Sequence, residues 1–452
     1  MKIYQYAKKS KNKNFPGTFC LLSFLLLAFF VVVLISATPS PGQKSQETDT
    51  ESELLTNVDE VFKEVSQIRD LEIKYPIRKG FKSQAELRDF VLKKLEEEYT
   101  DPEIAAETKA MVKWGLFPKD IQLKELLVNL LAEQVAGLYD PKEKIFYISN
   151  WIPGFLQKPI MAHELTHALQ DQYFDLDQFL RRVKDNDDEV LARTALIEGE
   201  ALAVMIEYLL KPQGLDFSTL TDLIPRLKNQ VSILGGDLGE EGQIPEIIKE
   251  TLLFPYLQGI SFVQTFRKSH PWKDFSQIYA DPPASSEQIL HPEKYFDARD
   301  RPIPITLENF SDLLPKDWKE IYTNVLGELG ISILIKKFAG EEMAKLAAEG
   351  WGGDRYKLLE DPNTGNLLLI HFSTWDSPKD AMEFFLAYRQ VVENKYTSAQ
   401  LLQSEKRRYY LWSTGEGEVY LEVKGTDVLV IEGASEDLVP AIQKRLWGSR
   451  KG

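Results

Sequence analysis

The stretch MAHELTHALQDQ, residues 161–172, contains two of the five histidines in the chain. His163 and His167 stand four residues apart, with Glu164 directly after the first. On an α-helix this spacing places both imidazoles on one side, one turn apart. Neutral imidazole nitrogens bind zinc, and two of them suit two corners of a tetrahedral site. The stretch therefore predicts a helix that carries two ligands of a Zn²⁺ ion.

Two acidic residues of this helix have predicted roles beside the metal. The Glu164 carboxylate would accept a proton from zinc-bound water and pass it to a leaving amine. Asp171 lies one turn beyond His167 and is a candidate to orient a ligand by hydrogen bonding. The alternative is an ordinary helix with structural histidines. The H-E-x-x-H pattern is rare by chance in a chain of this composition, which favours zinc.

A third ligand is expected on the following helix, predicted over about residues 188–210. This helix is apolar on nearly every side, so we expect it to be buried. It nevertheless contains Glu198 and Glu200, and a buried carboxylate needs a cation. The two point to opposite sides of the helix, so at most one is a direct ligand. Periodicity does not choose between them.

The motif HELTHALQD resembles the zinc helix of the gluzincin metallopeptidases, which include thermolysin and the zinc aminopeptidases. The resemblance covers residues 145–208 and implies a glutamate ligand on the next long helix. The E-G-x-A pattern of the aminopeptidase branch matches EGEA, residues 198–201, and selects Glu198. The thermolysin branch would select Glu200, but Val204 stands where that branch has an aspartate. The longer spacing here implies an insertion, FDLDQFLRRVKDNDD.

The same resemblance implies a strand before the zinc helix that pairs with an extended peptide substrate. KIFYIS, residues 144–149, would supply this strand, following a turn over residues 137–141. Gluzincins also stabilise the reaction's oxyanion with a tyrosine or histidine. The candidates are Tyr256 in FPYLQG and His291 in SSEQILHPEKY, although either could be structural. The chain is similar as well to exported bacterial proteins that share these motifs and GWGGDRY.

The N-terminus predicts a membrane segment. The run FCLLSFLLLAFFVVVLIS, residues 19–36, carries no charge. Lysines precede it and none follows until Lys44, which places the N-terminus in the cytoplasm and the remainder outside. We expect an uncleaved anchor. The alternative is a signal peptide cleaved near Ala37, which would release a secreted protein.

Composition limits the possible partners. The net charge is −15, and no basic cluster is interleaved with aromatic residues, so nucleic acid is not expected to bind. Cys20 is the single cysteine, so no intramolecular disulfide can form. The sequence does not indicate an oligomeric state.

The predicted fold class is α+β, and 452 residues suggest several domains. GWGGDRY, residues 350–356, is expected to form a tight turn. The predicted organisation is a cytoplasmic stub with an anchor or signal segment (1–37), a disordered linker (38–50), an N-terminal helical subdomain that could cover the next domain (51–103), a mainly helical gluzincin-like metallopeptidase domain with a small sheet (104–345) and a separate C-terminal α+β domain (346–448).

The sequence thus predicts zinc-dependent hydrolysis of peptides or proteins outside the cytoplasmic membrane. One alternative is a catalytically silent, zinc-stabilised scaffold whose C-terminal domain binds a cell-envelope partner. Another is a zinc hydrolase that acts on a non-peptide bond.

Overall fold

The computed structural model describes residues 51–132, 137–148, 154–220, 225 and 244–449. The predicted anchor, residues 19–36, and the predicted linker lie outside these ranges. Among the helices that are described, none combines the length and the apolar character needed to cross a membrane.

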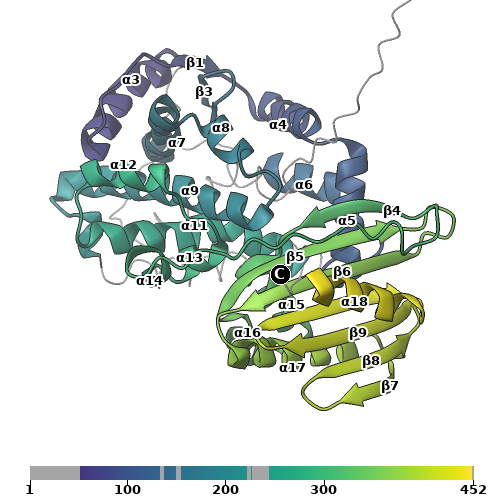
Figure 1. The fold of residues 1–452 in the computed structure, drawn as a ribbon. Coiled ribbons are helices and arrows are strands. Elements are labelled where there is room, and N and C mark those ends of the chain that lie inside the picture. The colour runs from purple at the N-terminus through teal and green to yellow at the C-terminus, as the bar shows by residue number, and fades with distance from the viewer. Residues whose placement is uncertain (1–50, 133–136, 149–153, 221–224, 226–243, 450–452) are drawn as a thin grey trace, which may run out of the picture.

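The described chain has an α+β fold, with a mainly helical part beside a seven-stranded antiparallel sheet (Figure 1). The long helix α9 packs on both α7 and α11, and α3 packs on α7 and α9. The helices of this part are α3 (Glu51–Arg69), α4 (Gln84–Glu98), α5 (Asp101–Trp114), α6 (Leu123–Ala132), α7 (Gly154–Phe174), α8 (Leu176–Arg181), α9 (Asp187–Leu210), α11 (Glu246–Arg267), α12 (Trp272–Ala280), α13 (Ser286–Leu290) and α14 (Glu293–Phe296).

The H-E-x-x-H motif lies within a helix, α7, as the spacing predicts. Helix α7 begins at Gly154 and contains Pro159 inside it. The predicted insertion between the two long helices contains the short helix α8. Asp175, the residue before α8, caps it by accepting a hydrogen bond from the Gln178 amide.

A three-stranded sheet precedes α7 and corrects two expectations. Its strands are β1 (Arg78–Phe81), β2 (Gly137–Asp140) and β3 (Ile145–Ile148), in the order β1-β3-β2. The predicted turn over residues 137–141 therefore contains strand β2. The turn comes later, where the Asp140 carboxylate accepts the amides of Lys142 and Glu143. KIFYIS is also the central strand and not an edge, because β3 pairs with both neighbours.

The second sheet has the strand order β4-β5-β6-β10-β9-β8-β7. Helix α18 and residues 307–314 pack on one face, while α17 packs on the other (Figure 1). Its elements are β4 (Lys319–Asn324), α15 (Gly327–Ala339), α16 (Glu341–Ala348), β5 (Trp351–Glu360), β6 (Leu367–Trp375), α17 (Pro378–Lys395), β7 (Gln400–Glu405), β8 (Tyr409–Thr414), β9 (Gly417–Lys424), β10 (Asp427–Ala434) and α18 (Leu438–Ser449).

Two further expectations are corrected in this sheet. Its first strand, β4, comes before the expected boundary at residue 346, so the C-terminal α+β unit begins earlier. Most of GWGGDRY is strand β5 and not a turn. Gly353 leaves room for the segment that contains Ile303, because a Cβ at Gly353 would lie 2.4 Å from the carbonyl oxygen of Ile303. The sequence around Gly353 could not reveal this distant contact.

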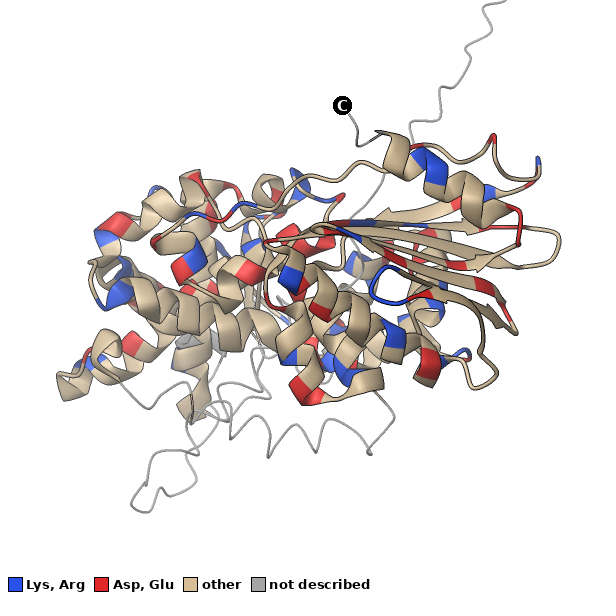
Figure 2. Ribbon diagram, turned by 60° about the horizontal axis from the view of Figure 1, so that its bottom comes forward, with Lys and Arg blue, Asp and Glu red and all other residues tan. Residues whose placement is uncertain are grey.

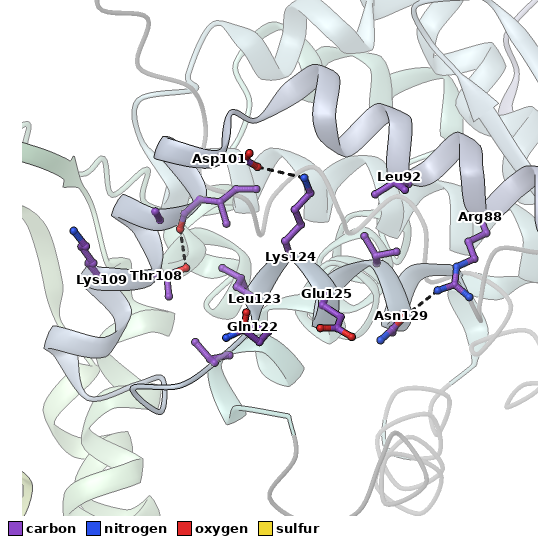
Figure 3. Close-up of a pocket in the computed structure, with 14 residues that line it drawn as sticks. Arg88, Leu92, Asp101, Thr108, Lys109, Gln122, Leu123, Lys124, Glu125 and Asn129 are labelled. Carbon is purple, nitrogen blue, oxygen red and sulfur yellow. Dashed lines mark hydrogen bonds and ion pairs between the residues drawn. The ribbon is translucent and has the colours of Figure 1, made fainter.

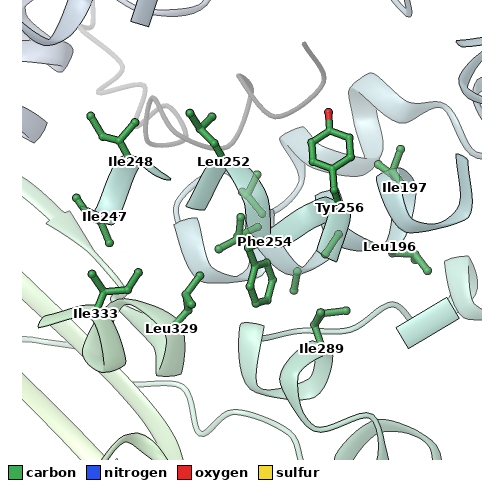
Figure 4. Close-up of a cluster of buried hydrophobic side chains, with 14 of the residues drawn as sticks. Leu196, Ile197, Ile247, Ile248, Leu252, Phe254, Tyr256, Ile289, Leu329 and Ile333 are labelled. Carbon is green, nitrogen blue, oxygen red and sulfur yellow. The ribbon is translucent and has the colours of Figure 1, made fainter. Parts of the chain in front are cut away.

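The helical part and the sheet share one hydrophobic core. Figure 4 shows a section of it, where side chains from α9 and α11 meet Ile289 of α13 and two residues of α15, Leu329 and Ile333. The same core continues to the sheet face through Trp351 and Tyr356. On the outside, basic and acidic segments are interspersed over both parts (Figure 2). The C-terminal unit therefore differs from the helical part in fold, but the two share a hydrophobic core.

Candidate metal centre

Three potential ligands converge between α7 and α9. The Nε2 atoms of His163 and His167 lie 2.9 Å apart. The Glu198 carboxylate oxygen Oε2 lies 3.1 Å from the first and 3.6 Å from the second. Each of the three side chains is almost completely buried. The two histidines of α7, four residues apart, and the inward-facing Glu198 of α9 thus bring two nitrogens and one oxygen close together.

The spacing of these atoms fits a small divalent cation. In a tetrahedral zinc site with bonds of about 2.0–2.1 Å, neighbouring ligand atoms lie about 3.3 Å apart. The three observed separations, 2.9, 3.1 and 3.6 Å, bracket that value. His163 Nδ1, Glu164 Oε1 and Glu198 Oε1 are buried without a hydrogen-bond partner among the described residues. Buried polar atoms are normally satisfied, so their concentration here marks a site with unmet polar contacts.

Glu164 is held beside these ligands by strand β2. Its Oε2 accepts a hydrogen bond from the Tyr139 amide at 2.8 Å. The Tyr139 hydroxyl donates to Asp171 Oδ2 at 2.7 Å, and Lys144 donates to the same oxygen at 2.5 Å. Asp171 was expected to orient a metal ligand. Instead it fastens β2 to α7, and through β2 it fixes Glu164.

Glu200, the alternative third ligand, engages other partners. Its carboxylate accepts hydrogen bonds from Arg69 of α3, from Gln170 of α7 and from Tyr279 of α12. The two glutamates point to opposite sides of α9, as helical geometry requires. Of the pair, Glu198 is the one that the fold brings to the histidines.

A close crossing of two helices brings Tyr256 to the same place. A Cβ at Gly199 of α9 would lie 2.3 Å from the backbone of Gly259 in α11, so both residues must be small. Tyr256 lies one turn before Gly259, and its ring centroid is 6.5 Å from that of His163. Figure 4 shows the tyrosine pointing away from Phe254, on the other side of α11. Gly199 of EGEA and Gly259 of FPYLQG thus contact each other where the two helices cross.

The other oxyanion candidate, His291, has a different environment. It lies between α13 and α14, and its Nε2 is 2.9 Å from Glu328 of α15. The hydrogen bond to the Glu328 carboxylate raises the pKa of His291 above its usual value.

Burial and mutual contact change the protonation of the cluster. Burial lowers the pKa of His163 to about 4, so this imidazole is neutral at pH 7. Burial raises the pKa of Glu164 to about 7. Burial alone would lower the pKa of His167, but the Glu198 carboxylate raises it to about 9. Burial opposes ionisation of Glu198, yet the His167 and His163 imidazoles hold its pKa below the usual value.

Sequence reasoning missed Gln170. Its side-chain oxygen lies 2.8 Å from His167 Nδ1, the ring nitrogen that faces away from the cluster. Its position three residues after His167 places it near that ring, which is the one signal the sequence offered.

Two other features are separate from this cluster. Glu287, Asp300 and Asp376 come close enough to suggest a metal site, but Lys294 already pairs with all three carboxylates at distances of 3.1 Å or less. The second is a surface groove of about 680 Å³ between α4, α5 and α6. Figure 3 shows Lys124 paired with Asp101 and Arg88 paired with Asn129 in this groove.

The described residues define an α+β chain in which an H-E-x-x-H helix meets a glutamate of the next long helix. Residues 316–443 match a family described as a domain of unknown function, DUF8575. That match spans β4 to α18 and excludes α7 and α9. Neither a curated protein nor a solved structure matches the chain.

Proposed function

We propose that the protein is a zinc-dependent metallopeptidase of gluzincin type. The observation that carries the proposal is the convergence of His163, His167 and Glu198 beside Glu164. We further propose that residues 19–36 anchor the chain and that the remainder lies outside the cytoplasmic membrane. The charge-free run and the lysines before it support this placement. Release by signal cleavage is the alternative.

The two imidazole nitrogens and the Glu198 carboxylate would hold the ion, a ligand set typical of catalytic zinc. Bound zinc would supply a water of lowered pKa and would polarise a substrate carbonyl. Among the described residues, no fourth histidine, cysteine or carboxylate joins the group. A protein site with three ligands leaves a position open for reaction.

Glu164 has the geometry of a proton carrier. The Tyr139 amide holds Oε2, and Oε1 has no hydrogen-bond partner among the described residues. The carboxylate can therefore accept a proton at Oε1 while its orientation is maintained, and then return that proton to the leaving amine. The proximity of the Tyr256 ring to His163 supports a role for that residue in stabilising the oxyanion.

Strand β2 is the best candidate to bind an extended peptide. In the described residues it pairs with β3 along one side only, and its residue Tyr139 contacts Glu164. All four residues of β2 are buried, and a peptide added along the side that lacks a neighbouring strand among the described residues would run beside the Glu164 carboxylate. The substrate-binding edge thus moves from KIFYIS, as we first expected, to the preceding strand.

The Glu164→Gln variant tests the mechanism. The amide keeps the shape of the side chain but cannot accept the proton, so peptide hydrolysis should fall by at least about 100-fold. Zinc content should be unchanged, because Glu164 is not a ligand. Hydrolysis of a diverse peptide mixture, with and without a chelator, measures the first effect and elemental analysis the second. Cleavage by the variant at the wild-type rate would refute the role of Glu164.

The burial of the three proposed ligands also fits an alternative function, a catalytically silent scaffold. His163, His167 and Glu198 are at most about 3% exposed, which also suits a closed structural zinc site in a silent scaffold. The number of protein ligands distinguishes the two. X-ray absorption of the zinc-loaded protein should show three protein ligands and one water. Four protein ligands would favour the scaffold, whose C-terminal unit would then bind a cell-envelope partner. Hydrolysis of esters but not of peptides would favour a hydrolase that acts on a non-peptide bond.

A further inference from the structure

A buried hydrogen-bond chain begins at the end of the first described helix. Arg69 is the last residue of α3, and its side chain is completely buried. Its Nε donates to the carboxylate of Glu200, which is also completely buried. A second guanidinium nitrogen donates to the Trp272 carbonyl at 2.8 Å, which holds the arginine against α12.

The chain continues from Glu200 to the zinc helix. Glu200 Oε2 accepts from Gln170 Nε2 at 2.9 Å and from the Tyr279 hydroxyl at 2.5 Å. The oxygen of the same glutamine side chain lies 2.8 Å from His167 Nδ1. Three links therefore join α3 to a residue of the candidate metal centre, although Arg69 and Glu200 are 131 positions apart.

These contacts determine which ring nitrogen of His167 faces the cluster with a lone pair. One end of the Gln170 amide faces the Ile197 carbonyl at 3.0 Å and the Glu200 carboxylate, and both of these only accept hydrogen bonds. That end must be the NH₂ group, so the amide oxygen faces His167. Nδ1 of His167 then carries a proton, and the lone pair of the neutral ring is on Nε2. Nε2 is the atom that lies 2.9 Å from His163.

We propose that Arg69, Glu200 and Gln170 are positioning residues that hold His167 in its metal-binding tautomer, so that α3 is an integral part of the metal centre. The inference rests on the proposed function, because it assumes that the cluster binds zinc. An α3 that positions His167 in this way is not a removable inhibitory cover. Partners of this kind typically contribute about 10- to 100-fold to metal affinity.

The test compares variants of the full-length chain. Gln170→Met removes the amide at nearly constant length and changes no charge. Arg69→Met removes the cation that pairs with Glu200. Glu200→Gln replaces the carboxylate by an amide, whose NH₂ group can face Gln170 in place of an accepting oxygen. Each should weaken zinc binding about 10- to 100-fold in competition with a chromogenic chelator. Each should also change the visible spectrum of the cobalt-substituted protein, which reports ligand geometry.

A matched control is the ion pair between Lys395 and Glu432, with side chains 8% and 0% exposed, in the C-terminal unit. Lys395→Met should lower thermal stability but leave zinc affinity and the cobalt spectrum unchanged. Wild-type affinity and spectrum in Gln170→Met and Arg69→Met would overturn the proposal. If Arg69→Met does not fold, Gln170→Met and Glu200→Gln decide.

Two further outcomes separate this proposal from the proposed function. Faster peptide hydrolysis by Arg69→Met would support a removable cover and overturn the positioning role. A wild-type chain that binds zinc but cleaves no peptide would overturn the peptidase function and leave the positioning role standing. A wild-type chain that binds no zinc would overturn both.

Discussion

Single buried atoms carry much of the argument for a metal centre. A buried polar atom without a partner costs about 1–3 kcal/mol, and three of them belong to His163, Glu164 and Glu198. A bound ion and its water could satisfy the two carboxylate oxygens together, whereas His163 reaches the cluster with Nε2 and not with its unpartnered Nδ1. The unmet contacts therefore predict that metal binding and folding stability are coupled.

Zinc should raise the stability of the folded protein. A ligand at about 100 times its dissociation constant stabilises the native state by about 2.7 kcal/mol. We expect a higher unfolding temperature with zinc than with a chelator. His163→Ala should abolish the difference, because it removes one of the three proposed ligands. An equal zinc effect in wild type and variant would place the ion elsewhere.

The phenol of Tyr256 is expected to act on the reaction and not on metal binding. Loss of one oxyanion donor typically lowers kcat by about 10²–10³-fold. Tyr256→Phe should show that loss, with KM and zinc affinity near the wild-type values, in steady-state kinetics on a cleaved peptide. His291→Ala is the comparison, since the structure places His291 against Glu328. A larger loss of kcat in His291→Ala would reverse the assignment.

At the scale of helices, the glycine contact between α9 and α11 determines how closely Tyr256 of α11 approaches His163. Gly199→Ala would place a methyl group 2.3 Å from the backbone of Gly259 and force the helices apart. We expect a loss of about 1–3 kcal/mol in the free energy of unfolding, measured by denaturant titration. Activity should fall as well, because the Tyr256 ring would move away from His163.

Gly154→Ala is the control for that prediction. A Cβ at this position of α7 would meet nothing within 4 Å, so stability should change by no more than about 0.5 kcal/mol. Equal effects of the two substitutions would show that the helix crossing is not close.

Element length decided which parts of the fold the sequence could predict. Helices α7 and α9 extend over several turns, so the H-E-x-x-H spacing predicted the first and the length of its apolar run predicted the second. Strand β2 has four residues, with a glycine and an aspartate at its ends, and its pattern is that of a turn. The choice between Glu198 and Glu200 was also beyond periodicity, because α9 is apolar all round. The choice depends on Arg69, a residue of α3 that is distant in the sequence and pairs with Glu200.

At the scale of the whole molecule, Trp114 joins the helical part to the sheet. It ends α5, is completely buried, and lies edge-on to three rings of the C-terminal unit. The centroid distances are 5.5 Å to Tyr356, 5.2 Å to His371 and 6.4 Å to Tyr388. Because the core is continuous across this contact, the two parts should unfold together, although their folds differ.

Trp114→Ala tests this coupling. Truncation of a buried tryptophan typically costs about 3–5 kcal/mol, so the unfolding temperature should fall substantially in calorimetry. We expect a single transition in both wild type and variant, and zinc should raise that transition in wild type although its ligands lie in the helical part. Trp412→Ala, a truncation on strand β8 of the sheet, should lower the same transition. Two separate transitions in wild type, with zinc raising one and Trp412→Ala lowering the other, would instead mean that the C-terminal unit is stable independently of the metal centre.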